Sequence, residues 1–156
     1  EPLEDDITIA GPIYADLYVS TTGTDADWVV KIIDVYPDGE ENPEPNPNNV
    51  EYGGYQRLIR YEIMRGKFRN CYEKPEPFLP NKITEVKIKL NDIDHTFLKG
   101  HKIMVQIQSS FFPFFDRNPQ KFVDIYSAEE KDFQKAVHKV YFSKDYPSHI
   151  KFNVIK

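Results

Sequence analysis

The chain contains serines, histidines and carboxylates, the residue types that together can form a nucleophilic triad. Such a triad needs a serine held at a sharp turn beside a histidine and a carboxylate. No G-x-S-x-G motif occurs, and each histidine taken alone is more typical of a surface or half-buried residue. Sequence order still leaves a triad open. Its candidates are Ser20, Ser109, Ser110, Ser127, Ser143 and Ser148, with His95, His101, His138 and His149.

Two pairs of residues have side chains of the types that bind metal ions. His95 and His101 are six positions apart, which fits no helical ligand pair, and residues 97–100 between them read as a tight turn. Asp25 and Asp27 could donate oxygen ligands to a calcium ion, but the loop has no glycine at the turning position and no distal glutamate. We therefore expect both aspartates to cap backbone amides before Trp28, and we predict no metal site and no cofactor.

The overall composition excludes several classes of function. The 156 residues include 25 acidic and 20 basic side chains, a net charge of −5 that disfavours nucleic-acid binding. The lysines between Lys82 and Lys89 alternate with apolar residues and indicate a solvated strand face. No apolar run is long enough to span a membrane. Cys71 is the single cysteine, so an intramolecular disulfide is excluded.

Apolar and polar residues alternate along most of the chain, which is typical of strands with one buried face. In residues 83–90, for example, Val86, Ile88 and Leu90 alternate with charged residues. Twelve prolines and seven glycines separate such runs, as an antiparallel domain with many turns requires. The expected strands are Ile7–Ala10, Tyr14–Ser20, Trp28–Tyr36, Tyr55–Arg65, Ile83–Leu90, Lys102–Ser110, Val137–Ser143 and Ile150–Val154.

One short helix is expected over Ala128–Lys135, because Ser127 and Glu130 have the spacing of a capping box. The proline-rich stretch Pro37–Val50 is predicted to be a long polar loop between strands. The predicted fold is therefore all-β, a jelly-roll β-sandwich of galactose-binding-like type with one short helix, forming one domain over residues 1–156.

The densest aromatic cluster of the chain lies where no regular strand can continue. The stretch SSFFPFFDRNPQ, residues 109–120, places four phenylalanines around Pro113, which cannot donate to a strand ladder. We expect at least two rings to fold against the sandwich and the others to form an exposed apolar patch, which usually marks a contact surface. The predicted contact residues are Phe111, Phe112, Pro113, Phe114, Phe115, Asp116, Arg117 and Asn118.

With these motifs in order, the chain resembles the C-terminal jelly-roll domain of the X-Pro dipeptidyl-peptidase family. That family includes cocaine esterase, glutaryl-7-aminocephalosporanic acid acylase-like proteins and α-amino acid ester hydrolases. The resemblance covers essentially the whole chain. It runs through EPLEDDITIAGP, TDADWVVKIIDVYPDG, GYQRLIRYEIMRGKFRN, EKPEPFLP, HTFLKGHKIMVQIQSSFFPFFDRNPQ and HKVYFSKDYPSHIKFNVI.

The resemblance implies a non-catalytic accessory domain of a serine hydrolase that cleaves ester or amide bonds without a cofactor. In the family the Ser-His-Asp triad belongs to an upstream α/β-hydrolase domain, so no residue of this chain inherits a catalytic role. This domain is expected to pack on the hydrolase domain and to help wall the substrate pocket. The absence of an initiator methionine and of a signal peptide fits a fragment of a larger protein, which could be a homo-oligomer.

Two other functions stay open. A free-standing carbohydrate-binding module is the main alternative, because sandwich folds often bind sugars through exposed aromatic rings. It would favour flat tryptophan or tyrosine rings, whereas this chain has one tryptophan and a phenylalanine-rich loop. The second open function is that of an enzyme that acts on its own. The cellular location is not determined by the sequence, and the resemblance is compatible with a secreted or periplasmic bacterial parent.

Overall fold

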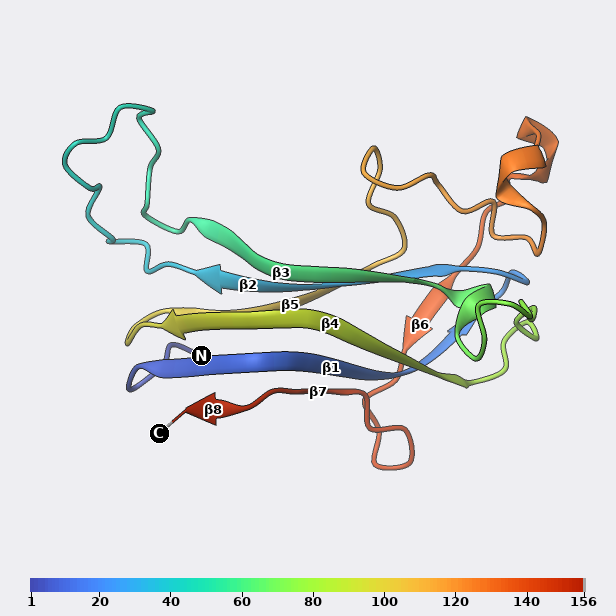
Figure 1. Ribbon diagram of the computed structural model, residues 1–156, viewed down its shortest axis with the longest axis horizontal. Coiled ribbons are helices and arrows are strands. Elements are labelled where there is room, and N and C mark those ends of the chain that lie inside the picture. Colours follow the sequence, from blue (N-terminus) through green and yellow to red (C-terminus); the bar gives the residue numbers. More distant parts are fainter. Residues whose placement is uncertain (156) are drawn as a thin grey trace.

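The computed structural model describes residues 1–155 and forms a sandwich of two antiparallel sheets (Figure 1). The sheet drawn lower in Figure 1, sheet A, has the order β4-β1-β6, and the short strands β7 and β8 also pair with β1. The upper one, sheet B, has the order β3-β2-β5. The strands are β1 Ile7–Thr21, β2 Asp27–Val35, β3 Gln56–Arg65, β4 Thr84–Phe97, β5 Lys102–Gln108, β6 His138–Val140, β7 His149–Lys151 and β8 Val154–Ile155.

The chain passes from one sheet to the other after β1, β3, β4 and β5, so that neighbours within a sheet are mostly distant in sequence. This arrangement confirms the predicted all-β jelly-roll sandwich. The predicted strands over residues 7–10 and 14–20 form one strand, β1, because a register shift between Gly11 and Ile13 absorbs the irregular Gly-Pro step. Gly11 has a φ of 90°, a conformation that glycine adopts without strain.

The core lies between the two sheets and follows the alternation read from the sequence. Trp28, Val30 and Ile32 of β2 are almost fully buried there, as are Val86, Ile88 and Leu90 of β4. The intervening residues of β4 point to solvent, so Lys87 and Lys89 form the predicted solvated face. Burial of each large side chain contributes about 1.5–3 kcal/mol. The core also includes Ile9, Ile13, Ala15, Leu17, Val19, Ala26, Phe78, Ile93 and Phe97.

The predicted helix over Ala128–Lys135 is wrong. The segment contains two three-residue 3-10 helices, Ile125–Ser127 and Glu130–Asp132. Ser127 does not cap Glu130, because its hydroxyl donates to the carbonyl of Asp124 instead. The capping box that does form joins Glu129 and Asp132, and the helix ends after one turn because the amide of Gln134 donates to the carbonyl of Pro119.

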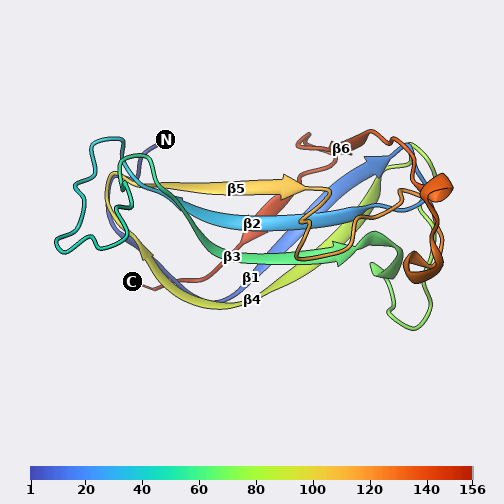
Figure 2. The same ribbon diagram turned by 90° about the horizontal axis from the view of Figure 1, so that it is seen from above.

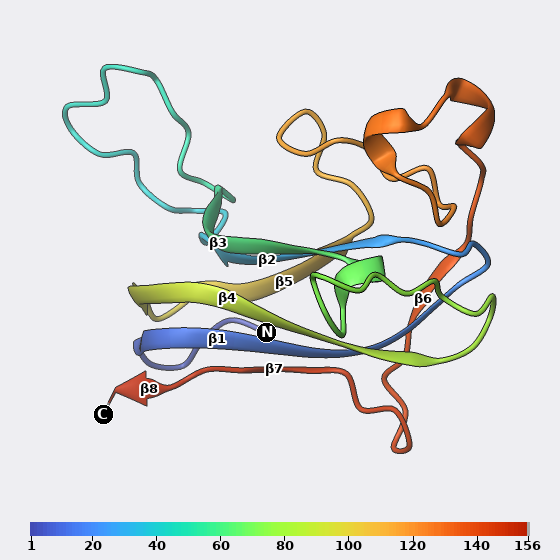
Figure 3. The same cartoon turned by 45° about the vertical axis from the view of Figure 1, so that its right-hand side comes forward.

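Two long loops rise from the outer side of sheet B, one near each end (Figures 1 and 3). The first joins β2 to β3 over residues 36–55 and contains the predicted proline-rich loop. The second joins β5 to β6 over residues 109–137 and begins with the phenylalanine cluster. Figure 2, which looks onto sheet B, shows the start of the second loop crossing above β2 and β3.

Candidate interaction surface

Residues 109–120, called the aromatic loop below, leave sheet B directly after Gln108 and fold back over its outer face. Phe111 and Phe115 are half-buried there and lie edge-on against Tyr61 of β3, with ring centroids 4.9 and 6.5 Å away. The ammonium of Lys31 in β2 lies 3.8 Å from the centroid of the Phe111 ring. Two of the four rings therefore attach the loop to the sheet.

The other two phenylalanines of the aromatic loop face solvent. Phe112 is 65% exposed and Phe114 is 72% exposed, although each ring is entirely apolar. Leaving such rings in water forgoes about 1.5–3 kcal/mol of burial free energy for each. Exposed apolar clusters of this kind usually mark contact surfaces. Asp116 and Arg117 follow the rings and are also exposed, and the Arg117 guanidinium lies 5.5 Å from the Phe133 ring centroid.

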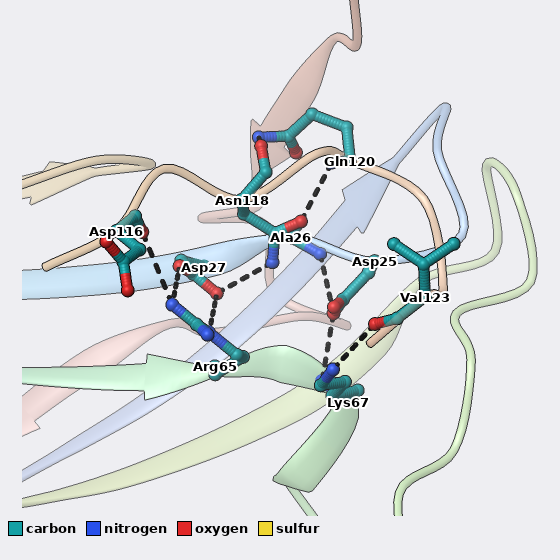
Figure 4. A network of polar contacts seen from close by, with 9 residues as sticks. All are labelled: Asp25, Ala26, Asp27, Arg65, Lys67, Asp116, Asn118, Gln120 and Val123. Atoms are coloured by element: carbon teal, nitrogen blue, oxygen red, sulfur yellow. Dashed lines mark hydrogen bonds and ion pairs between the residues drawn. The ribbon is translucent and has the colours of Figure 1, made fainter. Parts of the chain in front are cut away.

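A buried polar network holds the far end of the aromatic loop (Figure 4). The side-chain amide of Asn118 donates to the Asp27 carboxylate at 2.8 Å, and its oxygen accepts from the amide of Gln120 at 2.8 Å. Arg65 at the end of β3 lies 3.4 Å from Asp27 and donates to the carbonyl of Asp116 at 3.3 Å. The network ties the loop to the beginning of β2 and the end of β3.

Of the two aspartates predicted to cap backbone amides, Asp25 does so. Its carboxylate accepts from the amides of Ala26 at 2.9 Å and Lys67 at 3.0 Å. Lys67 is itself buried, and its ammonium donates to the carbonyl of Val123 at 2.8 Å. Burial raises the pKa of Asp25 above its ordinary value, against the hydrogen bonds and the Lys67 charge that lower it.

The same prediction is wrong for Asp27, which binds the side chains of Asn118 and Arg65 rather than backbone amides. The reason is its place as the first residue of β2, where its side chain points to the outer face beneath the aromatic loop. Burial raises the pKa of Asp27 and outweighs the Asn118 hydrogen bond and the Arg65 charge, which both favour the ionised form. Asp27 therefore holds Asn118 of the aromatic loop, whereas the hydrogen bonds of Asp25 join Ala26 and Lys67.

A hollow of about 430 Å³ lies beside Pro113, Phe114 and Phe115. Its wall includes the end of β3 and side chains that the sequence did not single out, among them Tyr72 and Tyr126. These two tyrosines are 77% and 90% exposed, so the apolar area around the hollow extends beyond the four phenylalanines. No sequence motif marked them, because each is an isolated ring in an irregular segment.

The outer face of sheet A has a different character. Asp16 of β1 lies 3.0 Å from Lys151 and 3.4 Å from His149 of β7, and Lys87 of β4 lies 3.4 Å from Glu85. Such exposed ion pairs are typical of a solvated surface. The loop-covered side of sheet B, where the exposed phenylalanines and the hollow lie together, is the candidate interaction surface.

Two of the candidate histidines meet at one carboxylate. The Asp34 carboxylate is bonded to His95 Nε2 at 3.0 Å and to His101 Nδ1 at 2.7 Å. This cluster joins β2 to the end of β4 and the turn after it. Within residues 1–155, no serine hydroxyl is hydrogen-bonded to a histidine, and no group of three or more His, Cys, Asp or Glu side chains is placed to hold a metal ion. The described part of the chain contains no helix long and apolar enough to cross a membrane.

Comparison with known proteins gives matches over the full length of the chain. The family described as the X-Pro dipeptidyl-peptidase C-terminal non-catalytic domain matches residues 1–151. The cocaine esterase of Rhodococcus sp. (strain MB1 Bresler) is 32% identical over the whole chain, which corresponds to 25% of the esterase.

Two solved structures are similar in sequence and in fold. An aminopeptidase from a marine sediment archaeon, Thaumarchaeota archaeon, is 44% identical with a TM-score of 0.92 over the whole chain and 25% of the aminopeptidase. An α-amino acid ester hydrolase is 42% identical with a TM-score of 0.91 over 99% of the chain and 24% of the hydrolase. The chain thus spans about a quarter of the length of each of these relatives.

Proposed function

We propose a function for this chain from the premise that it belongs to the family of X-Pro dipeptidyl-peptidase C-terminal non-catalytic domains. It serves as the accessory domain of a larger serine hydrolase that cleaves an ester or amide bond. The catalytic triad lies in an upstream α/β-hydrolase domain of the same polypeptide. The short span of the chain relative to its relatives supports this proposal.

The aromatic loop is the surface that packs against the hydrolase domain. The observation that carries this proposal is the exposure of Phe112 and Phe114 on a loop that is otherwise held in place. Phe111 and Phe115 fix one end to Tyr61, and Asn118 fixes the other end to Asp27. A loop held at both ends presents its two exposed rings with little conformational entropy left to lose, which favours binding.

Asp116 and Arg117 supply the polar edge of this contact and help wall the substrate pocket. Both side chains are exposed and follow directly after the apolar rings. Polar residues commonly surround the apolar centre of an interface in this way. Assembly of the parent protein into a homo-oligomer remains a prediction.

A substitution in the full-length protein tests the docking role. Phe112→Ser with Phe114→Ser should lower the thermal unfolding temperature and the hydrolytic activity, because two rings lose their burial in the interface. Phe142→Ser is the matched control, since Phe142 is 73% exposed but lies in the hairpin next to sheet A. Equal activity and stability in the double variant and the unsubstituted protein would refute the docking role.

The four phenylalanines of the aromatic loop give the carbohydrate-binding alternative no support, whereas the exposed Tyr72 and Tyr126 beside the hollow do carry the hydroxyl that it requires. The exposed rings of the aromatic loop are phenylalanines, which lack the hydroxyl or indole N–H that orients a sugar. Binding of soluble oligosaccharides to the chain, lost in the Phe112→Ser and Phe114→Ser variant, would favour the alternative over the accessory-domain proposal.

A further inference from the structure

The strand β3 forms one edge of sheet B, and this edge is open. β3 pairs with β2 on one side, and no strand within residues 1–155 pairs with its other side. The nearest strand on that side is β4, which belongs to sheet A and contacts β3 without pairing. An open edge presents unpaired N–H and C=O groups that can template a further strand.

The orientation of the free groups follows from one hydrogen bond. The amide of Gly66 donates to the carbonyl of Ala26 at 2.8 Å, so the next pair, Asp27 and Arg65, is a non-hydrogen-bonded pair of the antiparallel ladder. By alternation, the amides of Ile63 and Tyr61 also point away from β2. The Ile63 amide donates instead to the side chain of the adjacent Glu62 at 2.9 Å, which confirms its direction.

A groove follows this edge. The hollow of about 430 Å³ is lined by Ile63, Met64 and Arg65, and a second hollow of about 330 Å³ is lined by residues 58–62. Phe115 of the aromatic loop borders both hollows. A hollow over the face of a sheet would be lined by alternate residues, whereas eight consecutive residues of β3 line these two. The groove therefore runs along the backbone edge, for about 26 Å at about 3.3 Å per residue.

The walls of the groove indicate what it binds. Phe68, Tyr72 and Tyr126 line the hollow at the Arg65 end and favour an apolar side chain. At the other end, the Arg60 guanidinium already donates to the carbonyl of Asp92 in β4 at 2.7 Å and its Nε is buried, so we assign this side chain no contact with a bound segment. The Glu62 side chain covers one outward amide without closing the edge, since it bonds only to its own neighbour.

We infer that β3 accepts an extended segment of the hydrolase domain of the same polypeptide as an added strand. The inference rests on the proposed function and deepens it, because it gives the docking surface a main-chain component beside the exposed rings. The added segment places an apolar side chain in the hollow at the Arg65 end. Strand addition of this kind derives affinity from main-chain hydrogen bonds and specificity from side-chain pockets.

Hydrogen exchange of single amides in the full-length protein tests the inference. If a strand is added, the Tyr61 amide should exchange almost as slowly as the Glu62 amide, which faces β2. Its exchange rate should be lower than that of an unpaired edge amide by a factor of about ten or more. Rapid exchange at Tyr61 would overturn the inference. Protection that grows with protein concentration would also overturn it, because a second copy would then be the strand that pairs with β3.

A pair of substitutions provides an independent measurement. Ile63→Pro removes the outward amide without removing a hydrogen bond to β2, whereas Ile63→Ala keeps the amide and shortens the side chain. Limited proteolysis between the domains should be about tenfold faster for the proline variant than for the alanine variant. Equal rates in a folded proline variant would overturn strand addition. If proteolysis rates are equal but the Phe112→Ser and Phe114→Ser variant still separates the domains, strand addition is wrong and the docking proposal stands. If the proline variant does not fold, the hydrogen-exchange rate of the Tyr61 amide tests strand addition instead.

Discussion

The side-chain amide of Asn118 donates a hydrogen bond of 2.8 Å to the carboxylate of Asp27, across 91 residues of sequence. Both residues are buried, and this contact joins the aromatic loop to the first residue of β2. It explains how a loop without regular secondary structure can present two phenylalanine rings in a fixed direction. The sequence pointed to Asn118 only as a member of the loop and to Asp27 only as a cap.

Replacement of Asn118 should release the aromatic loop. Asn118→Ala leaves the buried Asp27 carboxylate with the Arg65 contact alone, which should lower the free energy of unfolding by about 1–3 kcal/mol. Denaturant unfolding measures the loss, and faster hydrogen exchange at residues 111–118 should accompany it. Asp116→Ala is the control, because Asp116 meets Arg65 through its backbone carbonyl, which the substitution keeps. A loss no larger than that of the control would contradict the anchoring role.

The buried carboxyl of Asp25 predicts a specific pH dependence. Burial raises its pKa above the ordinary value of 3.8, so the folded state binds this proton more tightly than the unfolded state does. The stabilisation from this group is therefore complete below about pH 3.8 and is lost as the pH rises through the raised pKa of the folded state.

Asp25→Asn isolates this effect, because the amide oxygen can still accept from Ala26 and Lys67 but does not titrate. The free energy of unfolding of the unsubstituted chain, minus that of the variant, should fall as the pH rises above about 3.8. Urea unfolding at a series of pH values measures the difference. A difference that grows with pH would show that the ionised carboxylate stabilises the fold, contrary to the account.

The hydrogen bonds of Asp34 to His95 and His101 should stabilise the end of the sandwich next to the N-terminal segment. The backbone amide of Leu3 also donates to the backbone carbonyl of His101 at 2.8 Å. This bond holds the N-terminal segment next to the turn after β4. Asp34→Ala leaves two histidine rings without their hydrogen-bond partner. The loss at the buried His101 costs about 1–3 kcal/mol, and the loss at the half-buried His95 costs less. Thermal unfolding measures the effect.

Asp94→Ala is the control for this prediction, since Asp94 is an exposed carboxylate on β4 beside His95. The Asp94 variant should unfold at nearly the same temperature as the unsubstituted chain. Equal unfolding temperatures for the Asp34 and Asp94 variants would mean that the cluster contributes nothing to stability.

Strand alternation made most of the fold predictable. Val86, Ile88 and Leu90 are buried as their spacing required, and β5 ends at Gln108, shortly before the cluster around Pro113. The helix over Ala128–Lys135 was wrong because a local capping signal says nothing of the long-range bond from Gln134 to Pro119 that ends the turn. Local patterns predict local structure until a distant partner competes for the same backbone group.

The contacts of the candidate surface were less predictable than its residues. Pro113 within the run of phenylalanines placed an apolar cluster in a loop, but which rings face solvent depends on Tyr61, a strand residue about fifty positions away. The hydrogen bonds from His95 and His101 to Asp34 were not predicted for the same reason, since Asp34 lies 61 and 67 residues from them in sequence. No spacing rule connects residues that meet only through the sheet topology.

The most direct test of the accessory-domain proposal is to label the full-length protein with a fluorophosphonate, which reacts with activated serine nucleophiles, and to map the labelled peptide. We expect a single labelled serine outside residues 1–156. A label on a serine of this chain, such as Ser109 or Ser148, would show a nucleophile within the domain and would contradict its non-catalytic role.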